Sequence, residues 1–272
     1  MKGLTKKAIA HFALLAVGLA IVAAAPLIFG DGNDIATGAV LLPPSPEHWF
    51  GTDNMWRDLV GRSLVGLRLS LTLAIVIQVI SFAVGVVIGG LSGYYGGVID
   101  HIYVAIQNVM MSFPSLVMSL CLILLLGTGI EALIIAISVT SWVSYARLVR
   151  GEVLTMRTAG FVTASRAIGC SEARLLFRHI IPNVIRPLIP LCVLMLGHTV
   201  LSIAGLSFLG FGVQPPTAEI GLMVNDGMNY LTRAPWLFLM PGVVLVAYTL
   251  LFNVCADDLQ DRLNPQDQLY SL

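Results

Sequence analysis

Three side chains that could bind a late transition metal lie within one apolar segment of this 272-residue chain. They are the thiol of Cys192, the thioether of Met195 and the imidazole of His198. Sulfur and imidazole ligands suit such metals, and a histidine inside an apolar segment is a functional candidate by default. The spacing places the three only loosely on one helical face. Metal binding by His198 and a simple hydrogen bond from His198 to a neighbouring helix therefore both remain open.

The chain lacks the residues on which common enzyme sites are built. Its only lysines are Lys2, Lys6 and Lys7, so a glycine-rich P-loop with its lysine cannot exist. No HExxH or GxSxG motif occurs, and the cysteines show no CxxC spacing. The formal charge of zero does not indicate a partner, and a basic surface for nucleic acid is absent. We therefore expect no catalytic residue, no ATPase site and no cofactor bound by this chain.

The elements that hold these residues are expected to be membrane helices. With 57% hydrophobic and 11% charged residues, the composition is not that of a water-soluble domain. An apolar helix of about 20 residues crosses the hydrocarbon core of a bilayer. Five segments meet that length, and a sixth contains Pro114, so we predict an all-α integral membrane protein with six spans. The expected spans are 8–29, 69–92, 104–126, 130–149, 186–209 and 237–256.

The distribution of lysine and arginine predicts the orientation. With the amino terminus inside, four basic residues fall outside, namely Arg57, Arg62, Arg68 and Arg233. The other basic residues fall inside, and they are Lys2, Lys6, Lys7, Arg147, Arg150, Arg157, Arg166, Arg174, Arg178, Arg186 and Arg262. The positive-inside rule therefore places both termini in the cytoplasm. A cleaved signal peptide ending near Ala25 is the alternative for the first span, and it leaves the remaining topology unchanged.

Residues 158–187 form a basic, amphipathic segment between two predicted spans. We expect a helix, a break at Gly169 and a second helix that Ser171 caps and Pro182 ends. Each helix has one apolar face, and its arginines lie outside that face. The pattern fits a docking element, and it also fits a hairpin that rests on lipid headgroups.

Glycines recur every four residues at Gly85, Gly89, Gly93 and Gly97. Such a stripe lets a second helix approach closely within a membrane. Packing within the chain is favoured over a dimer interface. Outside the membrane, we expect loop 30–66 to contain a short interfacial helix and loop 210–236 to contain a short helix over 218–231.

Four landmarks carry a resemblance to a known family. They are GTDNMWRD at 51–58, the segment from Thr163 to Pro182, LSFLGFGVQPPTAEIG at 206–221 and FNVCADDLQDRLNP at 252–265. Over about residues 46–265, the chain resembles the membrane subunit of a bacterial binding-protein-dependent ABC importer of the dipeptide/oligopeptide/nickel permease family. The resemblance implies a type I ABC importer permease fold with cytoplasmic coupling helices, a multi-pass protein of the inner membrane.

The resemblance also implies partners. These are a second homologous permease subunit, two ATP-binding subunits that use ATP and Mg, and a periplasmic or lipid-anchored substrate-binding protein, all assembled in membrane lipid. In the family, TASRAIG and HIIPN belong to the EAA loop, which contacts the ATPase. The coupling residues implied here are Thr163, Ala164, Ser165, Gly169, Glu172, Ile181 and Pro182. Thr163 departs from the acidic residue of the general motif, His179 from a frequent isoleucine, and Trp56 from the glycine usual in GTDxxGRD.

The substrate expected from the resemblance is nickel or a transition-metal chelate. Segments 197–210 and 215–226 look closest to the second, shorter nickel permease subunit, and a dipeptide or oligopeptide is the alternative substrate. We take His198, Met195, Cys192 and Met223 as candidates for the translocation path, with His198 as the candidate metal ligand. Glu219, Asp226 and Asp53 are candidates for contact with the binding protein.

Three regions follow from these expectations. Residues 1–66 form an N-terminal membrane helix and periplasmic loop, 67–260 form the permease core with coupling segment 158–182, and 261–272 form a cytoplasmic tail. Two other classes remain open. A secondary transporter would show inverted repeats and mid-membrane charges, and a non-transporting tether would leave uptake intact when deleted.

Overall fold

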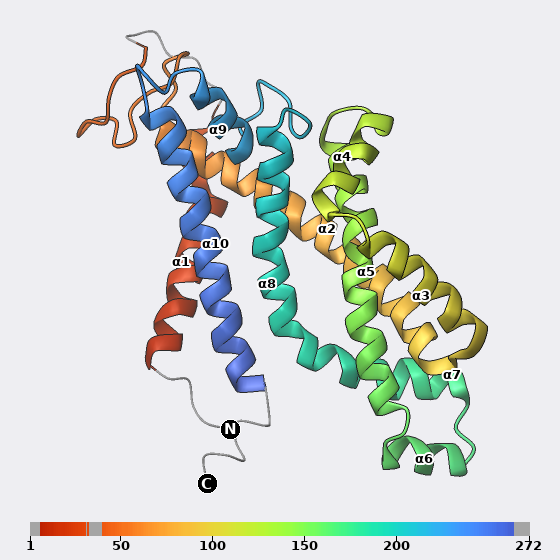
Figure 1. The fold of residues 1–272 in the computed structure, drawn as a ribbon. Coiled ribbons are helices and arrows are strands. Elements are labelled where there is room, and N and C mark those ends of the chain that lie inside the picture. The colour runs from red at the N-terminus through yellow and green to blue at the C-terminus, as the bar shows by residue number, and fades with distance from the viewer. Residues whose placement is uncertain (1–5, 31, 33–39, 264–272) are drawn as a thin grey trace.

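The computed structural model describes residues 6–30, 32 and 40–263, and within these ranges the chain forms helices and loops without a strand (Figure 1). The helices are α1 (Lys6–Phe29), α2 (Leu59–Tyr95), α3 (Gly97–Met111), α4 (Ser115–Leu126), α5 (Ile130–Met156), α6 (Gly160–Ala167), α7 (Glu172–Arg174), a π-helical turn (Leu175–Ile180), α8 (Ile181–Phe208), α9 (Ile220–Met228) and α10 (Trp236–Leu263). The predicted all-α class is confirmed. Lys2 and residues 264–272 of the expected tail lie outside the described residues.

Five helices are long and apolar enough to cross a membrane, as predicted: α1, α2, α5, α8 extended by α7 and the π-helical turn, and α10. The sixth predicted span, over 104–126, is sharply bent. This range begins inside α3 and crosses a 91° bend between α3 and α4. The bend lies at Pro114, whose ring disfavours a helical conformation in the residue before it and whose nitrogen cannot donate. Only if the bent pair counts as one span does the total in the described residues reach six.

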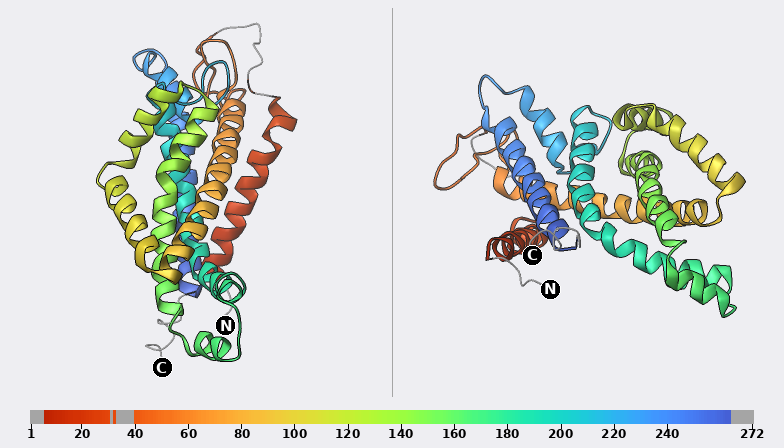
Figure 2. Two further views of the ribbon diagram at one scale, coloured as in Figure 1. Left: turned by 90° about the vertical axis from the view of Figure 1, so that its right-hand side faces the viewer. Right: turned by 60° about the horizontal axis from the view of Figure 1, so that its bottom comes forward.

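The two ends of the molecule differ in structure (Figure 1). The start of α1, the end of α10 and helices α6 and α7 lie at the lower end of Figure 1, and α9 and the loop before α2 lie at the upper end. The side view in Figure 2 shows the same division. The predicted basic segment and the helix ends nearest both termini therefore share one end of the protein.

Three glycines of the predicted stripe pack against α5 within the chain, whereas Gly97 begins α3 and an added Cβ atom there would meet no atom within 4 Å. A Cβ atom added to Gly85 would lie 2.5 Å from Cβ of Tyr145, and one added to Gly93 would lie 2.9 Å from the carbonyl oxygen of Arg150. A Cβ atom at Gly89 would overlap the backbone of Ala146. The two helix backbones can approach this closely only because these positions lack side chains.

Three separate clusters of buried apolar side chains lie along the long axis. The central cluster joins α2, α5 and α8 within the membrane-crossing region. The lower cluster joins the ends of α2 and α5 to α6, the π-helical turn and the start of α8. The upper cluster is smaller, and it consists of Leu59, Met223, Ala234 and Leu237. Each end of the molecule thus has its own packed core.

Helix α1 is held at the edge of the bundle by α2 and α10 (Figure 2). The hydroxyl of Tyr248 on α10 donates to the carbonyl oxygen of Gly18 at 2.7 Å. Nearer the lower end, Nδ1 of His11 lies 2.8 Å from a carboxylate oxygen of Asp258. These polar contacts fix α1 against α10.

At the upper end, α2 begins ten residues before the predicted span. Asp58 caps it by accepting from the backbone N–H groups of Val60 (2.8 Å) and Gly61 (3.2 Å). The separate interfacial helix expected in loop 30–66 is not found in residues 40–58, and residue 66 falls inside α2. The helix expected over 218–231 is present as α9.

Candidate functional site

The lower end carries a hairpin. Its first arm is α6, its turn lies at Gly169, and its second arm is α7 followed by the π-helical turn. Gly169 has a φ of 84°, a conformation that glycine adopts without strain, and this explains the predicted break. Ser171 starts α7, but its side chain makes no capping hydrogen bond. The prediction that Pro182 ends the second helix is wrong. Pro182 lies where the π-helical turn passes into α8, and the helical run continues from Glu172 through this position to Phe208.

The hairpin is anchored by apolar residues of both its arms. Val162 of α6 and Leu175, Leu176 and Ile180 of the π-helical turn are completely buried in the lower cluster. Ile181 is 8% exposed and packs against Gly90 of α2. The side chain of Ile181 therefore packs inside the molecule, and its part in coupling stays a prediction.

A polar cluster ties the hairpin to the end of α2. Nε of Arg166 donates to Glu172 at 2.9 Å, and one terminal nitrogen of Arg166 donates to the other carboxylate oxygen at 3.1 Å. The hydroxyl of Tyr94 on α2 also donates to Glu172, and Arg166 donates to this hydroxyl at 3.2 Å. Glu172 thus joins α6, α7 and α2 at one point.

A second polar cluster holds the neighbouring helix ends. Arg150 of α5 makes a two-pronged ion pair with Asp100 of α3 at 2.5 and 2.7 Å. Ser92 of α2 donates to the same carboxylate at 2.5 Å. The lower ends of α2, α3 and α5 are therefore joined by polar contacts, and α2 is joined to the hairpin through Tyr94.

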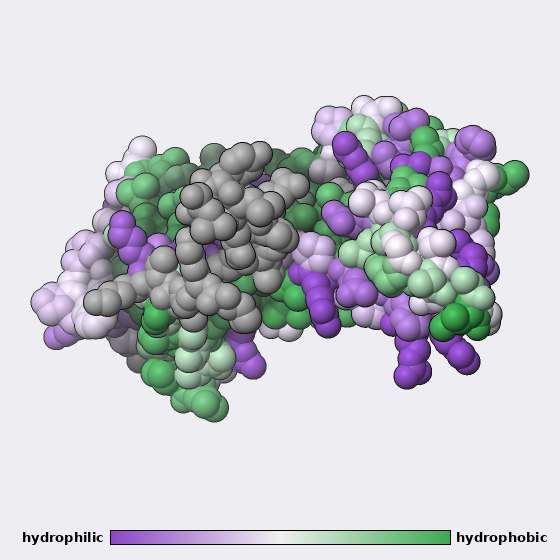
Figure 3. All heavy atoms as spheres, turned by 90° about the horizontal axis from the view of Figure 1, so that it is seen from below, coloured by the Kyte–Doolittle hydropathy of each residue, from purple (hydrophilic) through white to green (hydrophobic). Residues whose placement is uncertain are grey.

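The opposite surface of the hairpin is open. The side chains of Phe161, Phe177 and Ile168 are 44%, 53% and 87% exposed. Arg174 and Arg178 are also exposed. Figure 3 shows hydrophilic side chains gathered with apolar ones over this lobe, seen from below. An anchored element with an exposed apolar and basic surface can dock onto another protein.

The candidate path residues in α8 do not converge. His198 is exposed, and its imidazole makes no hydrogen bond to the described residues. Met223 is buried in the upper cluster, away from α8's Cys192 and Met195. Within the described ranges, no group of three histidine, cysteine or acidic residues could hold a metal ion. The structure therefore does not assemble the predicted metal ligands into one site.

The residue that links α8 to α2 in the membrane is one that sequence reasoning missed. The amide nitrogen of Gln78 donates to the carbonyl oxygen of Cys192 at 2.9 Å, and the hydroxyl of Thr199 lies 3.3 Å from Oε1 of Gln78. A lone glutamine within an apolar run is the signal that could have found it, because polar side chains join helices in lipid.

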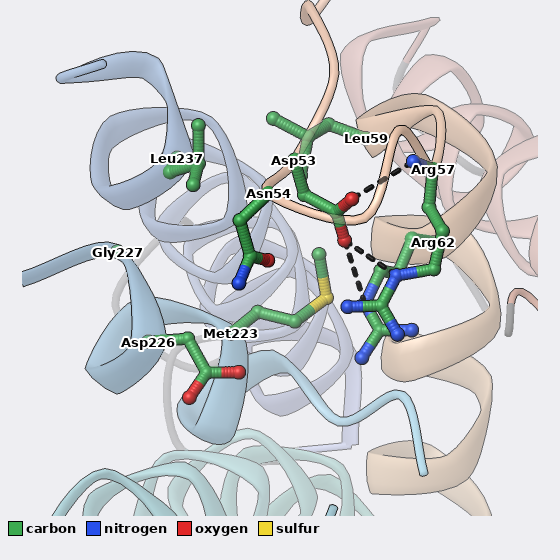
Figure 4. Close-up of a pocket in the computed structure, with 9 residues that line it drawn as sticks. All are labelled: Asp53, Asn54, Arg57, Leu59, Arg62, Met223, Asp226, Gly227 and Leu237. Carbon is green, nitrogen blue, oxygen red and sulfur yellow. Dashed lines mark hydrogen bonds and ion pairs between the residues drawn. The ribbon is translucent and has the colours of Figure 1, made fainter. Parts of the chain in front are cut away.

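At the upper end, Asp53 is a structural centre (Figure 4). Its carboxylate accepts from Nε of Arg57 at 2.5 Å, and Nε of Arg62 lies 3.9 Å from it. It also accepts from the backbone N–H groups of Met55 and Arg57, both at 2.8 Å. Asp53 is 4% exposed, so the expectation that it contacts a binding protein is not supported in this arrangement.

Glu219 is likewise a structural residue. Its side chain is completely buried, and it accepts from the hydroxyl of Ser70 at 2.7 Å and from the N–H of Leu222 at 2.9 Å. The carboxylate therefore caps α9 and joins it to α2. A completely buried side chain cannot contact another protein, which corrects the expectation for Glu219.

Asp226 lies on α9 across the small pocket from Asp53 (Figure 4). Partial burial of its carboxyl group raises the pKa of Asp226, while the positive charges of Arg62 and Arg57 act in the opposite direction. Of the three predicted contact residues, Asp226 alone remains a candidate.

Comparisons with known proteins agree with this arrangement. The family described as "Binding-protein-dependent transport system inner membrane component" matches residues 85–266. The chain is 39% identical over 235 residues to the nickel transport system permease protein NikC of Escherichia coli K12, covering 86% of this chain and 85% of that protein. It is 38% identical over 224 residues to the oligopeptide transport system permease protein OppC of Bacillus subtilis 168, covering 82% and 73%. The chain belongs to this family.

A solved structure shares the fold. The inward-facing MetNI methionine ABC transporter aligns with a TM-score of 0.59 at 21% identity, covering 75% of this chain and 96% of the matched chain. The protein is thus a multi-pass inner-membrane permease subunit of an ABC importer. Such permeases work with ATP-binding and substrate-binding proteins, and this one is a transport subunit rather than the ATPase.

The backbone at Trp56 has a conformation that glycine adopts without strain. Trp56, where glycine is usual, has a φ of 56°. This left-handed conformation costs a residue with a Cβ atom about 1–2 kcal/mol. Glycine is the natural residue here, and a tryptophan must be held in place by its surroundings.

Proposed function

We propose that segment 158–182 docks onto partner ATP-binding subunits and transmits their closure to the membrane helices. The exposed apolar and basic surface of the anchored hairpin is the observation that carries this proposal. Thr163, Ala164 and Ser165 of α6, together with Pro182, supply the coupling surface. Gly169 shapes the turn, and Glu172 fixes the hairpin to α2.

The proposed orientation places the lower end in the cytoplasm. The basic residues concentrate there, as the positive-inside rule requires. The partners proposed are a second homologous permease, two ATP-binding subunits below, and a periplasmic or lipid-anchored substrate-binding protein above. ATP and Mg are used by the partner subunits. In this arrangement the upper loops 40–58 and 210–236 face the binding protein, with Asp226 as the contact candidate.

The mechanism proposed is alternating access. Residues from Glu172 to Phe208 form one helical rod from the hairpin through the membrane. When the ATP-binding subunits close, the hairpin moves and α8 moves with it, because no loop separates them. Gln78 passes this motion to α2 through its hydrogen bonds to α8.

The substrate proposed is nickel, most simply within a small chelator. The similarity to the nickel permease NikC supports it. A chelated metal needs no ligand from the protein, which suits an α8 whose sulfur and imidazole side chains do not converge. A dipeptide or oligopeptide is the second candidate, because OppC is 38% identical to this chain.

The coupling proposal is tested by Gly169→Pro and Ala164→Asp in the complete complex. Proline cannot adopt the φ of 84°, and an aspartate would place a charge on the docking surface. Both variants are expected to insert normally but to lose substrate uptake. Gly160→Ala is the control, because no atom lies within 4 Å of the added Cβ. Full uptake by both variants would disprove the coupling assignment.

The substrate proposal is tested by uptake of radiolabelled nickel in proteoliposomes that contain this chain, its co-purifying partners and the binding protein. We expect uptake that requires ATP and that a dipeptide mixture does not reduce. His198→Ala then distinguishes a direct metal ligand from a structural histidine. If only peptide-loaded binding protein stimulates ATP hydrolysis, the substrate is a peptide and the nickel proposal is wrong.

A further inference from the structure

Helix α3 has a polar and an apolar exposed face. His101, Asn108 and Ser112 are exposed and recur at i, i+7 and i+11, so they lie on one face of the helix. Ile106 and Val109, on another face, are 44% and 61% exposed. In a bilayer an apolar face can contact lipid, whereas a polar face requires water or protein.

The upper end of α3 lies at membrane depth. The hydroxyl groups of Ser119 on α4 and Thr140 on α5 are 3.0 Å apart. A guanidinium nitrogen of Arg147 on α5 lies 3.9 Å from the sulfur of Met111, the last residue of α3. The bend between α3 and α4 is therefore level with the part of α5 between Thr140 and Arg147. This part lies within the expected span 130–149, and Figure 2 shows α3 and α4 as an arch at the edge of the bundle.

The backbone is not helical at the bend. The two helices differ in direction by 91°, and Ser112, Phe113 and Pro114 between them are exposed. At membrane depth, backbone outside a helix is tolerated only where it is buried in protein or lines a water-filled cavity. This chain does not bury these three residues, so a partner or water must cover them.

Arg147 favours water. Its side chain is exposed and makes no ion pair with any residue that the structure describes. Arg150, one turn further down, is by contrast paired with Asp100 at 2.5 and 2.7 Å. Ionisable side chains within membrane spans usually face the bundle interior or a water-filled cavity and mark substrate pathways. The planar guanidinium group matches the two oxygens of a carboxylate.

We propose that the polar face of α3 and the bend after it line the aqueous translocation pathway, and that Arg147 binds a carboxylate group of the passing substrate. The inference rests on the proposed alternating-access mechanism and names a chemical group that this mechanism must carry. Peptides have carboxylates, and so do the amino acids and organic acids that chelate metals. The proposal therefore does not depend on the choice between the two substrates.

The first test measures access of water to α3. In a transport-competent complex whose permease lacks the four native cysteines, Asn108→Cys and Ile106→Cys are treated with sulfonatoethyl methanethiosulfonate. The membranes are permeabilised, so the result does not depend on orientation. Asn108→Cys should react about tenfold faster, because the reactive thiolate forms in water and Ile106 lies on the apolar face. Equal rates would show that the polar face contacts a second permease or lipid, and would overturn the pathway.

The second test measures the charge of Arg147. Asn108→Cys is modified by the anionic sulfonatoethyl reagent and by the cationic trimethylammonioethyl reagent, and the ratio of the two rates is determined. Arg147→Gln should lower this ratio about fivefold, because one positive charge near the thiol is lost. Arg147→Lys should keep it. Arg68→Gln is the matched control, since it removes an exposed arginine from the upper part of α2. An unchanged ratio in Arg147→Gln would overturn the anion site.

Two further results separate this proposal from its neighbours. If Arg147→Gln does not assemble, excess citrate should still slow the anionic reagent at Asn108→Cys more than chloride of equal ionic strength, and no slowing would overturn the site. Arg147→Gln should also lose most substrate uptake in proteoliposomes, and Arg147→Lys should restore it. A lowered ratio with unchanged uptake would show that Arg147 borders water without meeting the substrate. The labelling requires neither ATP nor transport, so it can succeed even where the coupling proposal fails.

Discussion

Two carboxylates at the upper end, those of Asp53 and Glu219, stabilise the fold from buried positions. Glu219 joins two helices from a completely buried position. Its replacement by alanine leaves the N–H of Leu222 uncapped and removes one of the two acceptors near the hydroxyl of Ser70. We expect Glu219→Ala to lower the free energy of unfolding by about 1–3 kcal/mol, measured by thermal and denaturant unfolding in micelles. Glu131→Ala, at an exposed first turn of α5, is the control and should have a smaller effect. Equal effects would contradict the capping role.

Asp226 predicts a pH dependence of stability. Burial raises the pKa of this carboxyl group in the folded state, so the folded state binds the proton more tightly than the unfolded chain does. The contribution of this group to stability therefore falls as the pH rises from the ordinary aspartate pKa through the raised value. Asp226→Asn removes the free-energy cost of ionising this partly buried carboxyl group.

The expected result is an unfolding midpoint for Asp226→Asn that exceeds the wild-type value at neutral pH and converges with it at pH 4. Asp226→Glu keeps a titrating group and should retain a pH dependence. A constant difference between Asp226→Asn and the wild type across pH 4–8 would be evidence against this assignment.

At the scale of elements, the contact between the hairpin and α2 is the feature that most needs testing. Arg166 and Glu172 form a half-exposed ion pair, which adds little to stability by itself. The ion pair instead positions the hairpin against α2, because the hydroxyl of Tyr94 on α2 donates to the same carboxylate of Glu172. Arg166→Glu should reduce substrate transported per ATP hydrolysed by about fivefold, since the hairpin loses its fixed relation to α2.

The double variant Arg166→Glu with Glu172→Arg restores opposite charges and should recover part of the loss. Transport and ATP hydrolysis are measured together in proteoliposomes. Arg174→Glu changes the same charge on the same hairpin without this contact, and it serves as the control for docking. If the double variant is no better than the single one, the ion pair does not position the hairpin.

Long apolar runs predict where the membrane-crossing helices lie, because such runs are stable as helices in lipid. Glycine spacing predicts which face of a helix packs closely against another helix. The stripe at Gly85 and Gly89 meets α5 as its spacing indicates. The prediction for Pro182 was wrong because proline usually interrupts a helix, whereas here the helical run continues past it at the junction of the π-helical turn and α8.

The site is less predictable than the elements because its contacts join distant parts of the chain. Glu172 meets Tyr94 across 78 positions, and Gln78 meets Cys192 across 114. No local pattern indicates such pairs. Glu219 illustrates the same limit, since nothing in its neighbourhood in the sequence shows that Ser70 covers it.

At the scale of the whole molecule, the arrangement predicts which positions share a side of the membrane. Thr158 lies at the lower end beside the hairpin, and Asn229 follows α9 at the upper end; both are exposed. In a variant without the four native cysteines, an impermeant maleimide should label Asn229→Cys in intact spheroplasts. Thr158→Cys should react only after permeabilisation. The reverse pattern would overturn the proposed orientation.

The lower cluster has a consequence for the synthesis of this protein. It joins Tyr94 of α2 to Leu188 of α8, and a ribosome reaches Leu188 only after α3 to α7 have been made. At about 5–20 residues per second, this delay lasts roughly 5–20 s. During that time α2 and α5 can already pair through their glycine contact. The lower end of α2 still lacks its contacts with the π-helical turn and the start of α8. The nascent chain therefore completes its lower end only after α8 has been made, and apolar surface there is open to chaperones and proteases until then.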